Sequence, residues 1–146
     1  MIPAFKGPES IEFIIADRST DDLDLVVMSL GMIGCDETKV TTVRSAEETI
    51  KKVKELQSGD PKEPLVVMLN GQLSSPVSGL ACAEILNRMD CPKRRPMLVW
   101  CSNETLSNFT LQPYSANFAH FVKKPFSSSA AQELLEEVEN AINPMP

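Results

Sequence analysis

The sequence predicts an α/β fold in which a (βα)5 chain order builds a doubly wound, five-stranded parallel sheet. Three observations support this prediction. Five short apolar runs recur along the chain, stretches with helical periodicity separate them, and the 146 residues suit one domain with no linker long enough to divide it. Strands that alternate with helices in this way imply right-handed crossovers, which place helices on both faces of the sheet.

Five stretches are expected to form strands. The first, IEFIIAD, is a short run rich in Ile and Phe that predicts a buried strand, and the third, PLVVML, is a continuous apolar run of the kind found in strands that are buried on both faces. The second, KVTTV, is rich in β-branched residues, which favour strands. The fourth and fifth, PMLVWC and AHFVK, are short runs bounded by polar residues. The expected strands therefore span residues 11–17, 39–43, 64–69, 96–101 and 119–123.

The first helix is expected between the first two strands. Ser19 offers a side chain that can cap a helix, and acidic residues follow it, as suits a first helical turn. Apolar residues then recur at helical spacing from Leu23 to Leu30 and make one apolar stripe. Gly31 and Gly34 are expected to end this helix.

The remaining helices are predicted from their caps and their periodicity. Ser45 and Glu48 have the spacing of a capping box, and an apolar face follows them. A third helix is expected over residues 79–89, after a loop rich in Gly, Ser and Pro. One of the serines at 127–129 caps a last helix with a clear apolar repeat. Residues 104–115 are the least periodic part of the chain, and we expect a short or irregular helix there.

The charge of the chain limits the kinds of partner that it suits. Acidic residues exceed basic ones, and the formal net charge of −6 favours solubility and argues against nucleic acid or an anionic membrane as the main partner. The only basic cluster, KRR at residues 93–95, is expected to be solvated. The charge alone does not identify a partner, and the sequence leaves the oligomeric state open.

The sequence also predicts a cytoplasmic protein. No apolar run approaches the roughly 18–20 residues that span a bilayer, and the first ten residues, MIPAFKGPES, lack the apolar core and the cleavage site of a signal peptide. The cysteines show neither CxxC nor zinc-type spacing, so we expect core thiols in a reducing compartment and no metal site. They are Cys35, Cys82, Cys91 and Cys101.

Polar residues follow several of the predicted strands at their carboxyl ends. In an open parallel sheet, the functional crevice lies outside these ends. Asp17 follows the first strand, Asn70 the third, Ser102 the fourth, and Lys124 the fifth, within the run VKKPF. Because these ends meet at one edge of the sheet, the four residues are the first candidates for a functional site.

An Asp after the first strand and a Lys-Pro after the fifth, in this chain order, resemble the receiver domains of two-component response regulators. These are CheY-like members of the flavodoxin-like folds. The resemblance runs from about Glu12 to Ile142, and VKKPF is its most specific piece. It implies that residues 11–143 form a single receiver-like domain and that residues 1–10 are an N-terminal extension.

The resemblance also implies roles for individual positions. Receivers hold Mg²⁺ with two adjacent acids after the first strand, and these positions correspond to Ala16 and Asp17. The position of the phosphoryl-accepting Asp corresponds to Asn70. The Thr or Ser that ends the fourth strand corresponds to Cys101, or to Ser102 if the register shifts by one residue.

The fifth strand supplies the last two positions of the family site. The Lys of the family corresponds to Lys124, and the aromatic residue that reports the switch corresponds to Phe121. Since a neutral amide cannot replace the carboxylate nucleophile, Asn70 should not accept a phosphoryl group. Asp17 is the only acid left, so Mg²⁺ binding should be weak or absent and no cofactor is expected. What remains is a structural pair, Asp17 and Lys124, expected to be partly exposed with Asn70 between them.

The leading hypothesis is an atypical receiver, or pseudo-receiver, that acts as a phosphorylation-independent signalling and interaction module without catalysis. Its partner face would combine residues 104–123 with the last helix. One alternative is a receiver that responds to an ion or ligand at Asp17 and Lys124. Another is a cofactor-binding enzyme on a flavodoxin-like fold, although no Gly-rich phosphate loop follows the first strand. The aromatic residues of the expected partner face are Phe109, Tyr114, Phe118 and Phe121.

Overall fold

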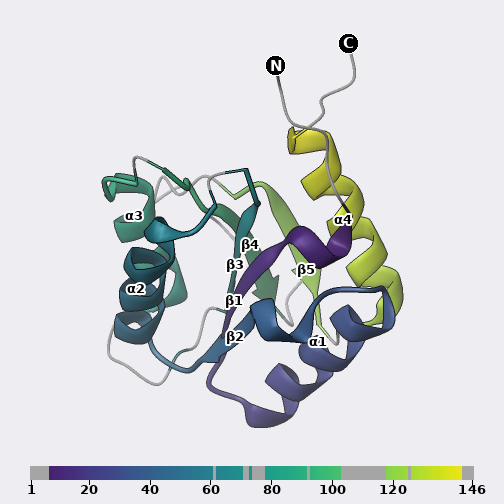
Figure 1. Cartoon of the computed structure of the whole chain (residues 1–146). Coiled ribbons are helices and arrows are strands. Elements are labelled where there is room, and N and C mark those ends of the chain that lie inside the picture. The colour runs from purple at the N-terminus through teal and green to yellow at the C-terminus, as the bar shows by residue number, and fades with distance from the viewer. Residues whose placement is uncertain are drawn as a thin grey trace.

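Five parallel strands form one sheet in the order β2-β1-β3-β4-β5 (Figure 1). The computed structural model describes residues 7–60, 62–70, 73, 78–91, 93–102, 118–124 and 126–142. Every predicted strand is present, and the doubly wound parallel fold is confirmed. The strands are β1 (Glu12–Ala16), β2 (Val40–Val43), β3 (Leu65–Asn70), β4 (Met97–Ser102) and β5 (His120–Lys123).

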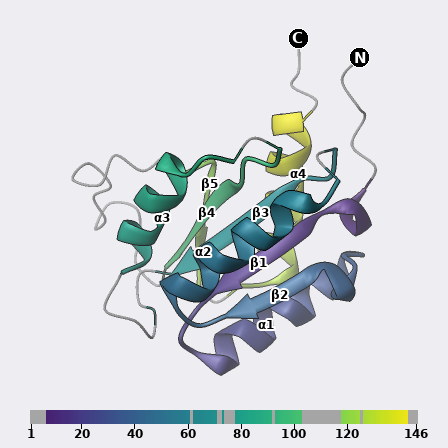
Figure 2. The same ribbon diagram turned by 60° about the vertical axis from the view of Figure 1, so that its left-hand side comes forward.

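Helices cover both faces of the sheet. In Figure 1, α2 and α3 lie on one side of the strands and α1 and α4 on the other, and Figure 2 brings α2 in front of the strands. Short 3-10 turns occur at Pro8–Ser10, Glu37–Lys39 and Leu56–Ser58. None of the described helices is long and apolar enough to cross a membrane. The α-helices are α1 (Thr20–Met32), α2 (Ala46–Glu55), α3 (Gly79–Arg88) and α4 (Ser128–Ile142).

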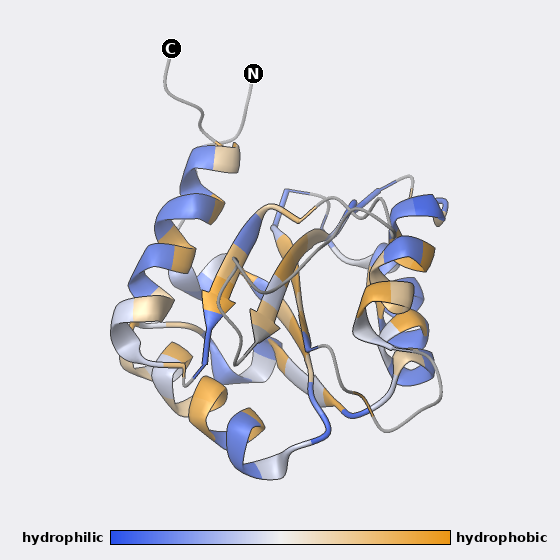
Figure 3. Ribbon diagram, turned by 180° about the vertical axis from the view of Figure 1, so that it is seen from behind, coloured by the Kyte–Doolittle hydropathy of each residue, from blue (hydrophilic) through white to orange (hydrophobic). Residues whose placement is uncertain are grey.

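The sheet separates two apolar cores. Alternate strand residues point to opposite faces, so Ile15 of β1 packs with the helices α1 and α4, whereas Ile14 packs with α2 and α3. The strands are mostly hydrophobic in Figure 3, and the helices carry hydrophilic residues beside hydrophobic ones. All four cysteines are free and buried, as expected of core thiols. Burial on both faces explains why β3 is a continuous apolar run in the sequence.

Serine caps begin the helices where the sequence predicts them. The Ser19 hydroxyl accepts from the backbone N–H of Asp22 at 3.3 Å. Ser45 accepts from the N–H of Glu48 at 3.1 Å, which is the N-cap bond of the predicted capping box, and its hydroxyl also donates to the Glu48 carboxylate at 3.0 Å. Of the three candidate serines before α4, Ser127 accepts from the N–H of Ala130 at 3.1 Å. Residues 104–115, where a short helix was expected, lie outside the described residues.

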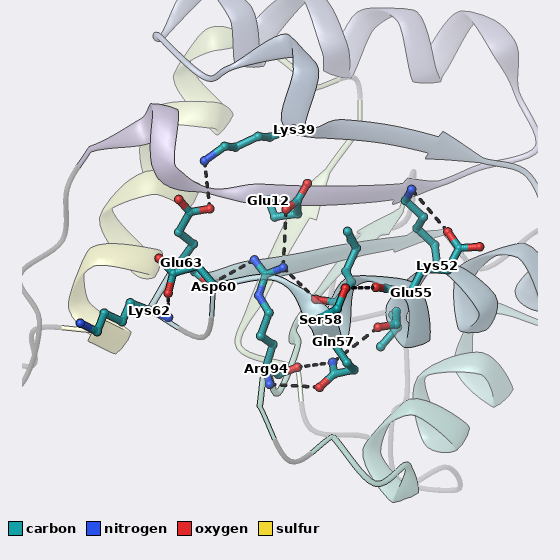
Figure 4. Close-up of polar contacts among 12 residues, drawn as sticks. Glu12, Lys39, Lys52, Glu55, Gln57, Ser58, Asp60, Lys62, Glu63 and Arg94 are labelled. Atoms are coloured by element: carbon teal, nitrogen blue, oxygen red, sulfur yellow. Dashed lines mark hydrogen bonds and ion pairs between the residues drawn. The ribbon is translucent and has the colours of Figure 1, made fainter.

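Arg94 corrects the expectation of a solvated basic cluster. Its side chain is 1% exposed, and its guanidinium donates to the carbonyl oxygens of Leu56 at 3.0 Å and Glu63 at 3.2 Å (Figure 4). An ion pair with Glu12 at 3.5 Å adds a charged partner from β1. Gly59 leaves the room for this, since a Cβ there would lie 2.6 Å from the guanidinium. Arg94 therefore joins the start of β1 to the segments that precede β3 and β4 at the amino end of the sheet.

The end of α1 corrects a second expectation. Gly31 lies inside the helix, which continues to Met32, so Gly31 does not end it. Gly34, in contrast, has φ +98°, a conformation that residues with a Cβ rarely adopt. It reverses the chain after the helix, and the N–H of Cys35 then bonds to the carbonyl of Leu30 at 3.1 Å.

We predict opposite effects for alanine at these two exposed glycines. Gly34→Ala should lower the free energy of unfolding by about 1–2 kcal/mol, because it puts a Cβ at positive φ. Gly31→Ala should raise it by up to about 1 kcal/mol, since alanine favours a helix interior and a Cβ there meets nothing within 4 Å. Urea denaturation of both variants measures the difference, and equal effects would contradict this account of the turn.

Candidate functional site

The carboxyl ends of four strands bring the predicted site residues together. Asp17 directly follows β1, Asn70 ends β3, and Lys124 directly follows β5. In the register of the sheet, Asn70 is paired with Cys101 of β4. Residues that lie up to 107 positions apart in the chain thus meet at one edge of the sheet.

Asp17 is the centre of this cluster. Its side chain is only 8% exposed. One carboxylate oxygen accepts from the backbone N–H of Ser19 at 3.0 Å. The other accepts from the side-chain amide of Asn70 at 3.0 Å and from the ammonium group of Lys124. The Asp17 carboxylate therefore receives hydrogen bonds from β3, from the start of α1 and from the residue after β5.

Lys124 also binds a second carboxylate, which the sequence analysis did not predict. Its ammonium donates to Asp22 in the first turn of α1 at 2.8 Å. The acid was visible in the sequence only as a first-turn residue that favours the helix dipole. No local signal connects it with a lysine 102 positions later.

The pair of Asp17 and Lys124 is buried, where a partly exposed pair was expected. The Lys124 side chain is 9% exposed. Burial lowers the pKa of Lys124, but its hydrogen bonds to Asp17 and Asp22, together with their charges, outweigh this effect and raise the pKa above its usual value. The lysine is therefore charged at neutral pH, and removing it would leave a buried carboxylate without its counter-ion.

Cys101 lies directly beneath this pair. Its side chain and those of Asp17 and Lys124 line a cavity of about 10 Å³. Burial raises the pKa of the Cys101 thiol to about 12; the charge of Lys124 opposes this shift and that of Asp17 adds to it. The thiol is therefore protonated at neutral pH and is a poor nucleophile. Ser102, the alternative for this position, is the last residue of β4.

Ala16 and the aromatic residues lie mainly with the other core. Ala16 is 2% exposed and belongs to the apolar cluster that faces α2 and α3. Phe121 is half-buried, with its ring centroid 5.9 Å from that of Phe118, and Phe118 meets Trp100 at 5.5 Å. Phe109 and Tyr114, the other members of the expected partner face, lie outside the described residues.

The donor set of this site does not fit Mg²⁺. Within the described ranges, no group of three or more His, Cys, Asp or Glu residues could hold a metal ion. Asp17 and Asp22 are both bonded to the Lys124 ammonium, and Asn70 directs its NH₂ group at Asp17. Mg²⁺ prefers several free oxygen ligands, whereas the centre of this cluster already holds a positive charge.

Comparison with known proteins identifies the fold. The chain matches no protein-family model and no curated protein. Its structure is similar to a CheY-like receiver domain of Methylobacillus flagellatus, with a TM-score of 0.66, 17% identity and coverage of 88% of this chain and 98% of that chain. It is also similar to a chemotaxis response regulator of Vibrio cholerae, with a TM-score of 0.70 and 16% identity. That match covers 88% of this chain and 98% of the other.

A third similar structure is the N-terminal domain of a response regulator/sensory box/GGDEF three-domain protein from Carboxydothermus hydrogenoformans. The TM-score is 0.66 at 17% identity, and the match covers 90% of this chain and 94% of that chain. At such identities the similarity establishes the fold alone. The chain has the fold of response-regulator receiver domains.

We predict that Lys124→Met destabilises the protein much more than Lys123→Met. The first change leaves Asp17 buried without its cation, which typically costs about 3–5 kcal/mol, whereas Lys123 is exposed on β5 and is the matched control. Urea denaturation gives both values. The double variant Asp17→Asn/Lys124→Met should recover part of the loss, and similar small losses for both single variants would contradict a buried pair.

We also predict that the stability difference between the wild type and Lys124→Met depends on pH. Because folding raises the pKa of Lys124, its contribution to stability is complete below the usual lysine pKa of 10.5 and is lost as the pH rises through the higher, folded value. The difference in unfolding free energy between the wild type and Lys124→Met should therefore stay constant from neutral pH to about pH 10 and shrink above it. A difference that persists or grows in this range would exclude a charged Lys124 as its source.

Proposed function

We propose that this chain is an atypical receiver domain, a pseudo-receiver, that acts as a phosphorylation-independent signalling and protein-interaction module. The observation that carries this proposal is the hydrogen bond from the amide of Asn70 to Asp17. Where the resemblance places the phosphoryl-accepting carboxylate, the chain has a neutral amide that is engaged with its neighbour. An amide cannot form an acyl phosphate by attack on a phosphodonor.

The rest of the site supports the same conclusion. Lys124, which corresponds to the lysine of the receiver family, is held by Asp17 and Asp22. The thiol of Cys101 is buried and protonated, so it offers no substitute nucleophile. We therefore propose that the module has no catalytic activity of its own and binds Mg²⁺ weakly or not at all.

The partner that we propose is a signalling protein or an adjoining domain. One similar structure is described as part of a three-domain protein with a response regulator, a sensory box and a GGDEF part, and by analogy we propose a similar setting for this chain. The net charge of −6 supports a protein partner over nucleic acid or an anionic membrane. We propose a cytoplasmic module of residues 11–143, with residues 1–10 as an extension.

An ion-responsive receiver at Asp17 and Lys124 is less well supported. Both groups are buried, and each has hydrogen-bond partners within the cluster. An external ion would have to displace the ammonium from two carboxylates. A cofactor-binding enzyme is also less well supported, because among the described residues the cavity beside Asp17 and Lys124 measures only about 10 Å³.

We predict that the wild type gains no phosphoryl group from acetyl phosphate with Mg²⁺, whereas the double variant Ala16→Asp/Asn70→Asp does. The variant restores two carboxylates beside Asp17, so Mg²⁺ should also raise its Tm and leave that of the wild type unchanged. Intact mass and thermal unfolding are the readouts. The fluorescence of Trp100, which packs in the core on the α2/α3 face of the sheet, is a secondary readout.

Asn70→Gln is the control, because it keeps an amide and should behave as the wild type does. A phosphoryl mass gain in the wild type would overturn the proposed function. It would mean that another residue accepts the phosphoryl group and that the domain is a working receiver.

A further inference from the structure

A groove opens beside α1, away from the Asp17–Lys124 cluster. It has a volume of about 220 Å³ and lies between the second half of α1 and the start of β2. Its wall is largely apolar, and part of it consists of residues that also pack in the core between the sheet and α1. The residues that line it are Val27, Met28, Gly31, Cys35, Glu37 and Val40.

Two methionines stand on α1 beside this groove. Met28 is 59% exposed and Met32 is 71% exposed, and they are two of the three large hydrophobic side chains that are exposed in the described part of the chain. They lie one helical turn apart, so their side chains form a short ridge. Flexible thioether side chains adapt their shape to a partner, and methionine is enriched in protein interfaces.

The surroundings of the groove are strongly acidic. From residue 19 to residue 38 the sequence holds five acids and no Lys, Arg or His. Asp22 binds Lys124, but Asp24, one turn before Met28, and Glu37, in the groove wall, are exposed. Lys39, which directly precedes Val40 in the groove wall, is already paired with Glu63 at 2.9 Å. The rim therefore offers negative charge to a partner.

We propose that this groove binds a cationic amphipathic helix of a protein partner. An apolar side chain of the partner helix enters the groove, and the ridge of Met28 and Met32 packs between its rows of side chains. Lysine or arginine residues on the flanks of the partner helix face Asp24 and Glu37. Repulsion between acidic rims disfavours a second copy of this chain as the occupant.

This surface lies away from the cluster of Asp17, Asn70 and Lys124, where phosphorylation would take place. Met32 lies ten residues after Asp22 on the same helix, about 15 Å along its axis. The inference rests on the proposed function only in treating the chain as an interaction module. It is tested without a phosphodonor, so its failure and that of the proposed function are distinguishable.

The experiment uses the full chain and a labelled designed peptide with leucines on one face and lysines on the other. Fluorescence anisotropy should show saturable binding, and chemical shifts should change along the second half of α1 and the start of β2. Met28→Ser/Met32→Ser should weaken binding about tenfold or more, as expected for interface anchors. Glu37→Lys should weaken it and reduce its salt dependence.

Matched controls lie elsewhere on the surface. Ile85→Ser removes an exposed hydrophobic side chain from α3, and Glu136→Lys reverses an exposed charge on α4, so both should leave binding unchanged. Equal binding of a scrambled peptide or of one broken by a central proline would overturn the proposal. So would tighter binding of a peptide with glutamates in place of the lysines, or a concentration-dependent dimer of the chain that blocks the groove.

Discussion

The carboxyl edge of the sheet depends on the ion pairs that the buried ammonium of Lys124 forms. A charge removed from water must be paired, and this one is bonded to Asp17 after β1 and to Asp22 in α1. Asp17 in turn accepts from Asn70 at the end of β3. The cluster around this cation thus connects the residues that follow β1 and β5, the end of β3 and the first turn of α1, and separating Asp17 from Lys124 would leave a buried carboxylate without its counter-ion.

The amino edge of the sheet is held by a different cation. The side chain of Arg94 is more deeply buried than that of Lys124, and its main partners are the backbone carbonyls of Leu56 and Glu63. A planar fork with several N–H groups suits carbonyls that arrive from different directions, whereas a compact ammonium suits carboxylates that converge on one point. Between these edges β1 and β3 are apolar and buried on both faces. Hydrogen bonds and ion pairs at the two edges therefore fix the position of these strands, because their apolar side chains form no hydrogen bonds that could do so.

The sequence predicted the parts of this structure that rest on local patterns. Continuous apolar runs identified the strands, and the serine caps identified the helix starts, because both signals lie within a few residues. The pairing of Asp17 with Lys124 followed from the resemblance to receivers. Asp22 and Arg94 were missed because their partners are distant in the chain: a first-turn acid and a run of basic residues look solvated until the fold places partners beside them. Gly31 was misassigned because an exposed glycine is tolerated inside a helix.

Helix α1 connects the two ideas about function. Its first turn is tied to Lys124 through Asp22, and its second half carries the methionines beside the groove. In a domain that switches, a change at the carboxyl edge would alter the helices attached to that edge. If the site accepts no phosphoryl group, as we propose, the lysine keeps these contacts and α1 stays in one position. On the proposed function, the former phosphorylation site keeps a binding surface in a constant arrangement, which lowers the ordering cost of binding a partner.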